Sequence, residues 1–156
     1  MLRDFVYFKT IKELKSEKFN WNNISNVGGV YIVVYKKLNR PEFLPVGSGG
    51  EFKGRDPNVS KNILLENWVD FKSGEDRILY IGKSVKLRRR IKSYIKFGEG
   101  RSVAKWGGRY IWQIANSGNL EIYWKEAKNP REEEKRMLYK FKDKHEQRLP
   151  FANLRM

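Results

Sequence analysis

The sequence predicts a small mixed α/β domain in which a few strands are flanked by helices. Two short runs of β-branched and aromatic residues, 30–35 and 78–81, are typical of buried strands. Two longer stretches, 84–97 and 130–145, carry apolar residues at helical spacing. The chain has 156 residues, which suits one domain with a sizeable core, so residues 1–156 are expected to form a single unit.

The N-terminal stretch, residues 2–19, predicts an amphipathic helix because its apolar residues recur about every three positions. These residues are Phe5, Phe8, Ile11 and Leu14. A turn-rich stretch at 20–26 ends this helix, and the first strand follows at 30–35 after two glycines.

The stretch between the two strands is expected to be a loop followed by a helix. Residues 36–58 contain three prolines and a Gly-Ser-Gly-Gly sequence, which disfavour regular structure. Ser60 is a good N-cap for a helix over 60–71. We expect Trp68 and Phe71 of this helix to pack on the core.

Four elements follow the second strand, which stops at Gly82. The sequence predicts a helix over 84–97, strands at 108–114 and 120–124, and a last helix over 130–145. The tail after it is apolar and interrupted by proline, so we expect it to be packed.

The composition restricts the chemistry. Lys and Arg number 33 against 18 Asp and Glu, a net charge of +15, which indicates a polyanionic partner. There is no cysteine and a single histidine, His145, so disulfides, thiol nucleophiles and zinc sites of Cys or several His are excluded. No secretory signal and no membrane-spanning apolar run is visible, so we expect a soluble, cytoplasmic protein that does not bind membranes.

The predicted helix over 84–97 is strongly basic. Its buried stripe consists of Leu87, Ile91, Tyr94 and Ile95. Its solvent face consists of Arg89, Lys92 and Lys96. Arg90 lies at the edge of the stripe, one turn before Tyr94. An arginine there has a packed stem and a guanidinium aimed at one place, which suits phosphate recognition; the alternative is an arginine that extends past the core to water.

Three successive glutamates begin the last helix. Glu132 and Glu133 lie in its first turn, where the capping box and the helix dipole account for them. Glu134 lies in the apolar stripe formed by Met137, Leu138, Phe141 and His145. A carboxylate in that place needs a partner. The two interpretations are a salt bridge to an arginine at the core edge and a ligand for a hard divalent ion such as Mg²⁺.

Two strand motifs resemble the paired signatures of the GIY-YIG nuclease family. They are Gly29-Val30-Tyr31, with Val in place of Ile, and Tyr80-Ile81-Gly82. After the second motif, Lys83, Arg90 and Tyr94 match the family's lysine, its arginine eight residues after the glycine, and its Tyr/His position.

Two C-terminal features extend this resemblance. Glu134 is similar to the family's metal-binding glutamate, with Glu132 and Glu133 as alternatives if the register is shifted. The sequence Pro150-Phe151-Ala152-Asn153 resembles its terminal Pro-x-x-Asn, in which the Asn braces the site. In all, the resemblance covers residues 28–35, 78–98 and 120–154.

The resemblance implies a small, mostly antiparallel sheet flanked by helices, and hydrolysis of DNA phosphodiester bonds with Mg²⁺ (or Mn²⁺). The catalytic residues that it implies are Tyr31, Tyr80, Lys83, Arg90, Tyr94, Glu134 and Asn153. Tyr31 or Tyr80 would position or deprotonate the water, and nearby cations would favour a phenolate. Arg90 would hold the scissile phosphate, and Glu134 would bind the metal.

In two respects the chain departs from the family pattern. The gap from Glu134 to Asn153 is longer than in the compact repair members of the family. The two motif strands are usually joined by a short hairpin, whereas here residues 36–77 separate them. We expect this stretch to be an insertion at the hairpin tip that contacts DNA, and residues 1–27 to be an N-terminal extension. Deletion of residues 39–56 is expected to leave a folded protein. The predicted DNA-binding residues are Lys36, Lys37, Lys53, Arg55, Lys83, Lys86, Arg88 and Arg90.

Other functions also fit these residues. Glu126-Ala127-Lys128 mimics half of a different restriction-nuclease signature but lacks an upstream acidic partner. The +15 charge and 22 aromatic residues also suit a non-catalytic nucleic-acid-binding module. A membrane-surface role for the basic helix is disfavoured because the core needs its narrow apolar face. The expected partner is duplex or branched DNA.

Overall fold

The computed structural model describes residues 2–5 and 7–156, without the side chain of residue 7. Its centre is an antiparallel sheet of four strands in the order β1-β4-β2-β3. The strands are β1 (Tyr7–Thr10), β2 (Gly29–Val34), β3 (Ile78–Ser84) and β4 (Glu121–Glu126). The predicted small α+β architecture with an antiparallel sheet is therefore confirmed.

Four α-helices and four short 3₁₀ helices surround the sheet. The α-helices are α1 (Ile11–Lys15), α2 (Lys61–Asn67), α3 (Leu87–Gly98) and α4 (Pro130–Lys144). The 3₁₀ helices are η1 (Leu2–Asp4), η2 (Trp21–Asn23), η3 (Arg109–Gln113) and η4 (Ser117–Asn119). In the part of the chain that the structure describes, no helix has the length and apolar character needed to cross a bilayer.

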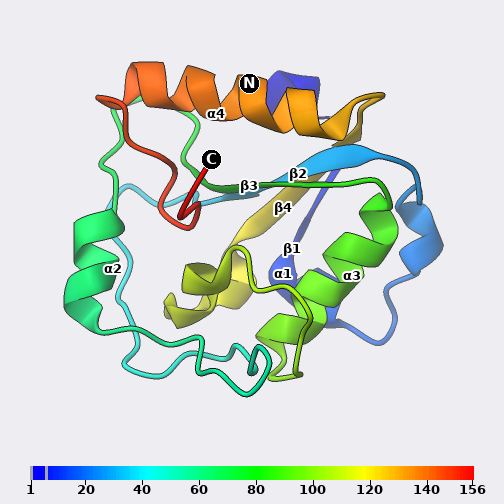
Figure 1. Ribbon diagram of the computed structural model, residues 1–156, viewed down its shortest axis with the longest axis horizontal. Coiled ribbons are helices and arrows are strands. Elements are labelled where there is room, and N and C mark those ends of the chain that lie inside the picture. The colour runs from blue at the N-terminus through cyan, green and yellow to red at the C-terminus, as the bar shows by residue number, and fades with distance from the viewer. Residues whose placement is uncertain (1, 6) are drawn as a thin grey trace.

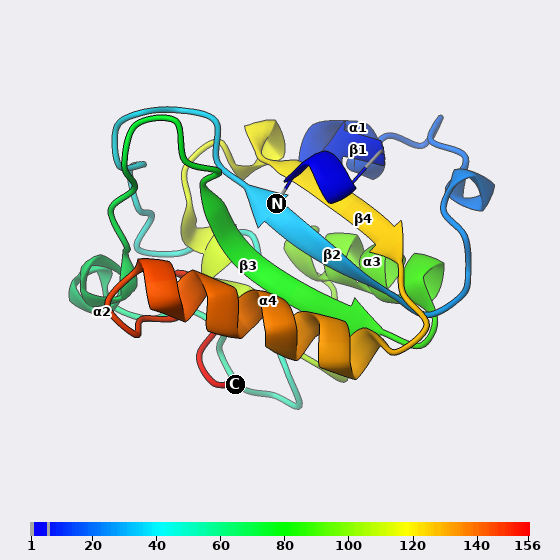
Figure 2. The same cartoon turned by 90° about the horizontal axis from the view of Figure 1, so that it is seen from above.

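The helices cover the two faces of the sheet. Figures 1 and 2 show α4 along one face and α3 with α1 on the other. The strand β2 is buried throughout, and its side chains alternate between two cores. Val30 and Ile32 pack with Met137 of α4, whereas Tyr31 and Val33 pack on the α3 side. The unbroken apolar run of β2 follows from this burial on both faces.

The register of β2 and β3 sets the motif residues opposite one another. Tyr31 pairs with Gly82, and Val33 pairs with Tyr80, so all four face α3. The two strands are antiparallel neighbours although residues 35–77 separate them. The long connection therefore leaves and re-enters the sheet at one end of a single strand pair.

The predicted helix over 2–19 is wrong for most of its length. Residues 7–10 form β1, which pairs with residues 121–124 of β4, and only Ile11–Lys15 is helical. Thr10 starts this short helix with a capping box to Glu13. Position 6 lies outside the described residues. Pairing with the edge of β4 stabilises the extended form of residues 7–10 more than the local helical spacing stabilises a helix, so this stretch is part of the sheet.

The predicted strand at 108–114 is also wrong. Residues 109–113 form the 3₁₀ helix η3, and the side chains of 110–113 are all buried. When every side chain of a short run is buried, buried and exposed positions do not alternate along it. Its hydrophobic pattern then cannot distinguish a strand from a helical turn. The carbonyls of Trp112 and Gln113 accept from Ser48 N at 3.0 Å and Leu44 N at 2.7 Å, so this turn pairs with the insertion.

The insertion is anchored in the core. Phe43 is buried and stacks on Phe151 at 5.5 Å between ring centroids. Trp68 belongs to the same core and Phe71 packs against it, as expected. Deletion of residues 39–56 would remove Phe43 and the backbone bonds to η3. The expectation that this deletion leaves a folded protein therefore does not agree with the structure.

The remaining predictions of helices and of the tail agree with the structure within a few residues. Ser60 caps α2, which ends earlier than predicted, at Asn67. The start of α3 is Leu87 instead of the expected 84. The tail is packed: Phe151 is buried, and Ala152 N donates to Leu79 O of β3 at 2.8 Å.

Candidate functional site

Three tyrosines of the two motifs and of α3 meet on the α3 face of the sheet. The ring centroids of Tyr31 and Tyr80 are 5.9 Å apart, those of Tyr31 and Tyr94 5.9 Å, and those of Tyr80 and Tyr94 5.8 Å. All three side chains are buried. The Tyr31 hydroxyl has no well-formed hydrogen bond among the described residues. The sequence motifs thus converge on one cluster, which we call the tyrosine cluster.

Glycine makes this cluster possible at two positions. A Cβ atom on Gly82 would lie 2.5 Å from Cζ of Tyr31, so the Tyr31 ring lies directly against the backbone of β3. A Cβ atom on Gly107 would lie 2.8 Å from the Tyr80 hydroxyl. Any side chain at either place would displace a tyrosine. The glycine of the second motif therefore has a steric role at the cluster.

Arg90 lies half-buried at the edge of the tyrosine cluster, as its place on the predicted helix wheel indicates. A Cβ atom on Gly107 would lie 3.7 Å from an Arg90 Nη atom and 2.8 Å from the Tyr80 hydroxyl. Arg90 and Tyr80 are therefore close to the same point of the Gly107 backbone. Tyr31 is the main cause that raises the pKa of Arg90, and Tyr80 adds to it. Arg90 is therefore a fixed positive charge beside the three hydroxyl-bearing rings.

Burial raises the pKa of two tyrosines of the cluster, Tyr80 and Tyr94. It is the largest cause that raises the pKa of Tyr80, and Arg90 offsets this only in part. Burial likewise raises the pKa of Tyr94, whose hydroxyl donates to Gly108 O at 2.8 Å. At Tyr80, Arg90 lowers the pKa as expected, but burial outweighs this effect, so the neutral hydroxyl is favoured without a metal ion.

Lys83 and Glu134 form a separate pair on the opposite face. Lys83 pairs in register with Val30, whose side chain packs under α4. Lys83 Nζ lies 3.2 Å from Glu134 Oε1, and the Glu134 side chain is 15% exposed. The cation that stabilises Glu134 is thus a lysine of β3 instead of the expected arginine. The tyrosine cluster and Glu134 lie on different faces of β3, the edge strand of the sheet.

The other two glutamates have structural partners. Glu133 lies 2.8 Å from Lys125 Nζ and also pairs with Arg136. The hydrogen bond from Arg136 is the main cause that lowers the pKa of Glu133 to about 2. The backbone of Glu132 donates to the cap residue Asn129. The Glu132 carboxylate is exposed and stays an alternative, and Glu134 is the metal-ligand candidate that the resemblance indicates.

The carboxylate of Glu134 fits a magnesium ion only in company with other oxygens. Among the described residues, no three Asp, Glu, His or Cys side chains gather where they could hold a metal. Magnesium is commonly bound through one or two carboxylates together with substrate phosphates and water. The single carboxylate of Glu134 fits such a donor set only if a substrate phosphate and water supply the other oxygens.

Asn153 braces the edge strand. Its Oδ1 accepts from Ile81 N at 2.8 Å, and its Nδ2 donates to Ile81 O at 2.9 Å. Without Asn153 both backbone groups of Ile81 would lack these partners, because β3 has no neighbour on that side. The residue holds Ile81 between Tyr80 and Gly82, so it acts on the cluster through the backbone.

The predicted DNA-binding residues are spread over the molecule. Lys36 pairs with Glu121 at 3.4 Å, beyond the far end of β2 from Tyr31. Arg88 donates to Ile24 O at 2.7 Å, which gives it a structural bond. The exposed ones are Lys36, Lys37, Lys53, Arg55, Lys83 and Lys86. Of these, Lys36, Lys37, Lys53 and Arg55 lie on the insertion, residues 36–77.

Two structural residues were missed from the sequence. Gln113 is 1% exposed and bonds Leu44 O, Val59 O and Val59 N of the insertion. Trp106 lies next to the Gly107-Gly108 pair, and its ring contacts Arg55 and Arg109. A tryptophan followed by two glycines in a basic stretch is the only sequence pattern that could have drawn attention to it.

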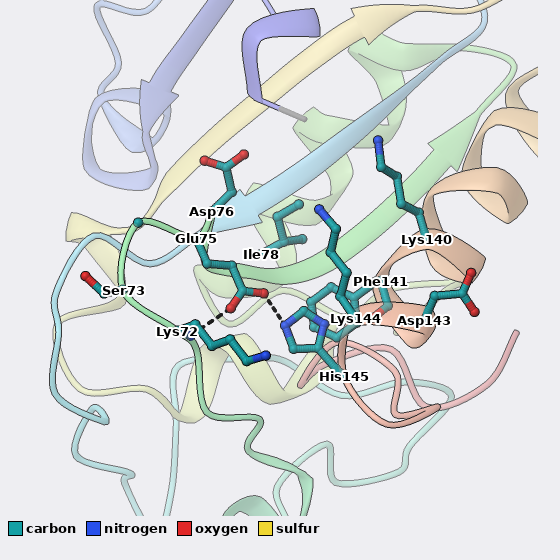
Figure 3. Close-up of a pocket in the computed structure, with 11 residues that line it drawn as sticks. Lys72, Ser73, Glu75, Asp76, Ile78, Lys140, Phe141, Asp143, Lys144 and His145 are labelled. Carbon is teal, nitrogen blue, oxygen red and sulfur yellow. Dashed lines mark hydrogen bonds and ion pairs between the residues drawn. The ribbon is translucent and has the colours of Figure 1, made fainter.

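The structure also has a cavity of about 500 Å³ away from the predicted site residues. It lies between the loop 72–76 and the C-terminal end of α4 (Figure 3). Glu75 there contacts Nε2 of the buried His145, whose Nδ1 is 2.8 Å from Phe141 O. This contact ties the loop to the helix end, which is a structural use of the single histidine.

The chain was compared with protein-family models, curated proteins and solved structures, and none of the three comparisons found a match.

Proposed function

We propose that this protein is a metal-dependent DNA endonuclease of the GIY-YIG type. The observation that carries the proposal is the convergence of Tyr31, Tyr80, Tyr94 and Arg90 on one face of the β2–β3 pair. The spacing of 49 residues between the two motif tyrosines does not require such convergence. The +15 charge supports a polyanionic substrate.

In this proposal Arg90 binds the scissile phosphate and stabilises the charge that develops on it. Tyr31 and Tyr80 hold the attacking water, and Tyr80 does so as a neutral hydroxyl because burial raises its pKa. Tyr94 positions Arg90 and the other rings through its bond to Gly108 O. Asn153 keeps the motif backbone at Ile81 in place.

Glu134 is the residue that would hold the divalent ion at the edge of β3. A bound Mg²⁺ or Mn²⁺ supplies Lewis-acid stabilisation of the leaving oxygen. Lys83 neutralises Glu134 in the structure, so Lys83 must release this carboxylate for metal binding and is then free to contact a phosphate.

A second function is a non-catalytic DNA-binding module. The specific observation in its favour is that Glu134 pairs with Lys83 on the face opposite the tyrosine cluster. A protein of this kind would keep the positive charge and the folded core, and it would need no metal.

Plasmid nicking separates the two functions. Supercoiled plasmid and a branched duplex are incubated with the protein and Mg²⁺, with the Arg90→Ala variant as the matched control. An endonuclease nicks the plasmid only with the divalent ion, and the variant loses most of this activity. A binding module retards both DNAs in a gel and cuts neither.

A further inference from the structure

The ring of Trp106 contacts two arginines from distant parts of the chain. The Arg109 guanidinium lies 4.0 Å from the Trp106 ring centroid, and that of Arg55 lies 4.8 Å from it. Phe52 stacks on the same ring at 4.7 Å. We call these residues the Trp106 clamp: Phe52, Arg55, Trp106 and Arg109.

The clamp joins the insertion to the segment before η3. Phe52 forms bridges with Arg55 and with Val103, and Val103 N donates to Glu51 O at 3.0 Å. In Figure 1 the insertion passes below the C-terminal end of α3, where the segment that leads to η3 begins. The two arginines are therefore positioned by backbone pairing as well as by the ring.

The positive charge of the clamp is not neutralised. Within the described part of the chain, neither Arg55 nor Arg109 takes part in an ion pair. The carboxylate next to Arg55, that of Asp56, accepts from Asn58. Burial and the neighbouring Arg55 both lower the pKa of Arg109. Two like charges held on one ring are unfavourable until an anion arrives.

A stacked guanidinium is suited to phosphate. Stacking uses the face of the group, so the N–H donors along its edge remain available. The ring also fixes the side chain in advance, which reduces the entropy lost when it binds. Two such cations on one ring offer two phosphate contacts to a nucleic-acid strand.

The clamp also lies next to the proposed catalytic residues. Gly107 follows Trp106 directly and lies against the Tyr80 hydroxyl and Arg90. Gly108 precedes Arg109 and accepts the hydroxyl of Tyr94. The same four-residue stretch, 106–109, thus contributes its backbone to the tyrosine cluster and its side chains to the clamp.

We propose that the Trp106 clamp grips the phosphate backbone of duplex DNA beside the phosphate held by Arg90. Its placement beside the scissile phosphate rests on the proposed function, whereas its contact with DNA does not need cleavage. The insertion supplies Arg55 and the first residue of η3 supplies Arg109, so both segments contribute a cation to the proposed contact.

The test measures binding without chemistry. A short fluorescein-labelled duplex is titrated in EDTA at several salt concentrations, and fluorescence anisotropy gives the affinity. The clamp variant Arg55→Gln/Arg109→Gln is compared with Lys140→Gln/Lys144→Gln, which loses the same charge from exposed positions on α4. Thermal unfolding verifies that both variants fold.

We expect the clamp variant to lose affinity about 10- to 50-fold at 0.1 M salt and the salt slope to fall by about 2, one contact for each arginine. The α4 variant should lose less than about 3-fold. Equal losses in both variants, or none in the clamp variant, overturn the proposal.

A conservative variant tests the proposal if the Arg55→Gln/Arg109→Gln variant does not fold. Arg55→Lys/Arg109→Lys keeps the charge and removes the planar fork, so we expect a loss of affinity at a nearly unchanged salt slope. Wild-type affinity in this variant overturns the proposal. Loss of binding in the clamp variants with a wild type that never cuts DNA rejects the proposed function and supports the clamp. If the wild type cuts DNA and the clamp variants bind and cut like the wild type, the proposed function is supported and the role of the clamp is rejected.

Discussion

At the scale of single residues, the site is governed by burial. The three tyrosine rings lie inside the core, and Arg90 is the cation at their edge. Glu134 and Lys83 satisfy each other at a distance of 3.2 Å on the other face. The residues that carry the resemblance therefore lie in two places, the tyrosine cluster on one face of the sheet and the Lys83–Glu134 pair on the other. Substitution can distinguish their roles.

Arg90 and Arg89 form a matched pair, because they are neighbours on α3 and only Arg90 reaches the tyrosine cluster. Arg90→Ala should lower the DNA cleavage rate on the order of 10²-fold or more, as the loss of one transition-state charge donor does. Arg89→Ala should change the rate by less than about 3-fold. Similar small effects of both changes, in single-turnover assays, would mean that α3 is only a basic face.

The pH dependence of cleavage tests how Tyr80 acts. Burial raises its pKa, so the neutral hydroxyl is the dominant form over the whole neutral range. The logarithm of the single-turnover rate should therefore rise with pH between about 7 and 9.5 without a plateau, because the hydroxide concentration rises. A tyrosinate base with a lowered pKa would give a plateau near neutrality, and Tyr80→Phe would remove it.

Glu134→Gln tests the metal ligand. Mg²⁺-dependent cleavage should fall on the order of 10²-fold or more, while DNA affinity in EDTA stays the same or increases, because one negative charge is removed. Glu133→Gln is the control, because Lys125 and Arg136 already pair with that carboxylate. The assignment is wrong if Glu134→Gln cuts DNA at the wild-type rate or if Glu133→Gln shows the larger loss.

At the scale of elements, one side chain adds three hydrogen bonds to the packing that anchors the insertion. Gln113 of η3 accepts from Val59 N at 2.9 Å and donates to Val59 O at 2.8 Å and Leu44 O at 3.0 Å. Because the amide is buried, these backbone groups have no access to replacement water. The position of the Trp106 clamp thus depends on an amide on the opposite side of the insertion.

Gln113→Ala should lower the free energy of unfolding by about 3 kcal/mol, since it leaves buried backbone groups unpaired. Urea denaturation followed by tryptophan fluorescence measures the change. Gln147→Ala is the control and should cost less than about 0.5 kcal/mol, because Gln147 is exposed. A loss below about 1 kcal/mol at Gln113 would mean that the insertion is held by packing alone.

At the scale of the whole molecule, charge and fold have separate roles. The sheet, α3 and α4 build the core, and the excess of 15 positive charges lies over it. Some of these charges are used in structural bonds, as at Lys36 and Arg88. Others, on the insertion and on the solvent side of α3, have no such partner and are available to a polyanion.

DNA affinity should therefore fall steeply with salt. If about six phosphates are contacted, the affinity should drop about 10³-fold between 50 and 200 mM salt. Anisotropy titrations of wild type in EDTA give the slope directly. A slope near zero would exclude backbone neutralisation as the source of binding.

The sequence by itself determined the strands at 30–35 and 78–81, the basic helix with Arg90 at its edge, and the last helix with its cap. Each of these carries a strong local pattern: a β-branched run, a helical stripe, or a Pro after an Asn cap. The tyrosine motifs were likewise visible, because they lie within such elements. Their function stays a prediction.

Only the tertiary structure decided the rest. Residues 7–10 became a strand because β4 offered a free edge, and residues 109–113 became a 3₁₀ helix because the insertion took their carbonyls. The Trp106 clamp and the pairing of Glu134 with Lys83 each join segments about 50 residues apart. Contacts of this kind depend on which surfaces the fold brings together, and local sequence patterns contain no record of that.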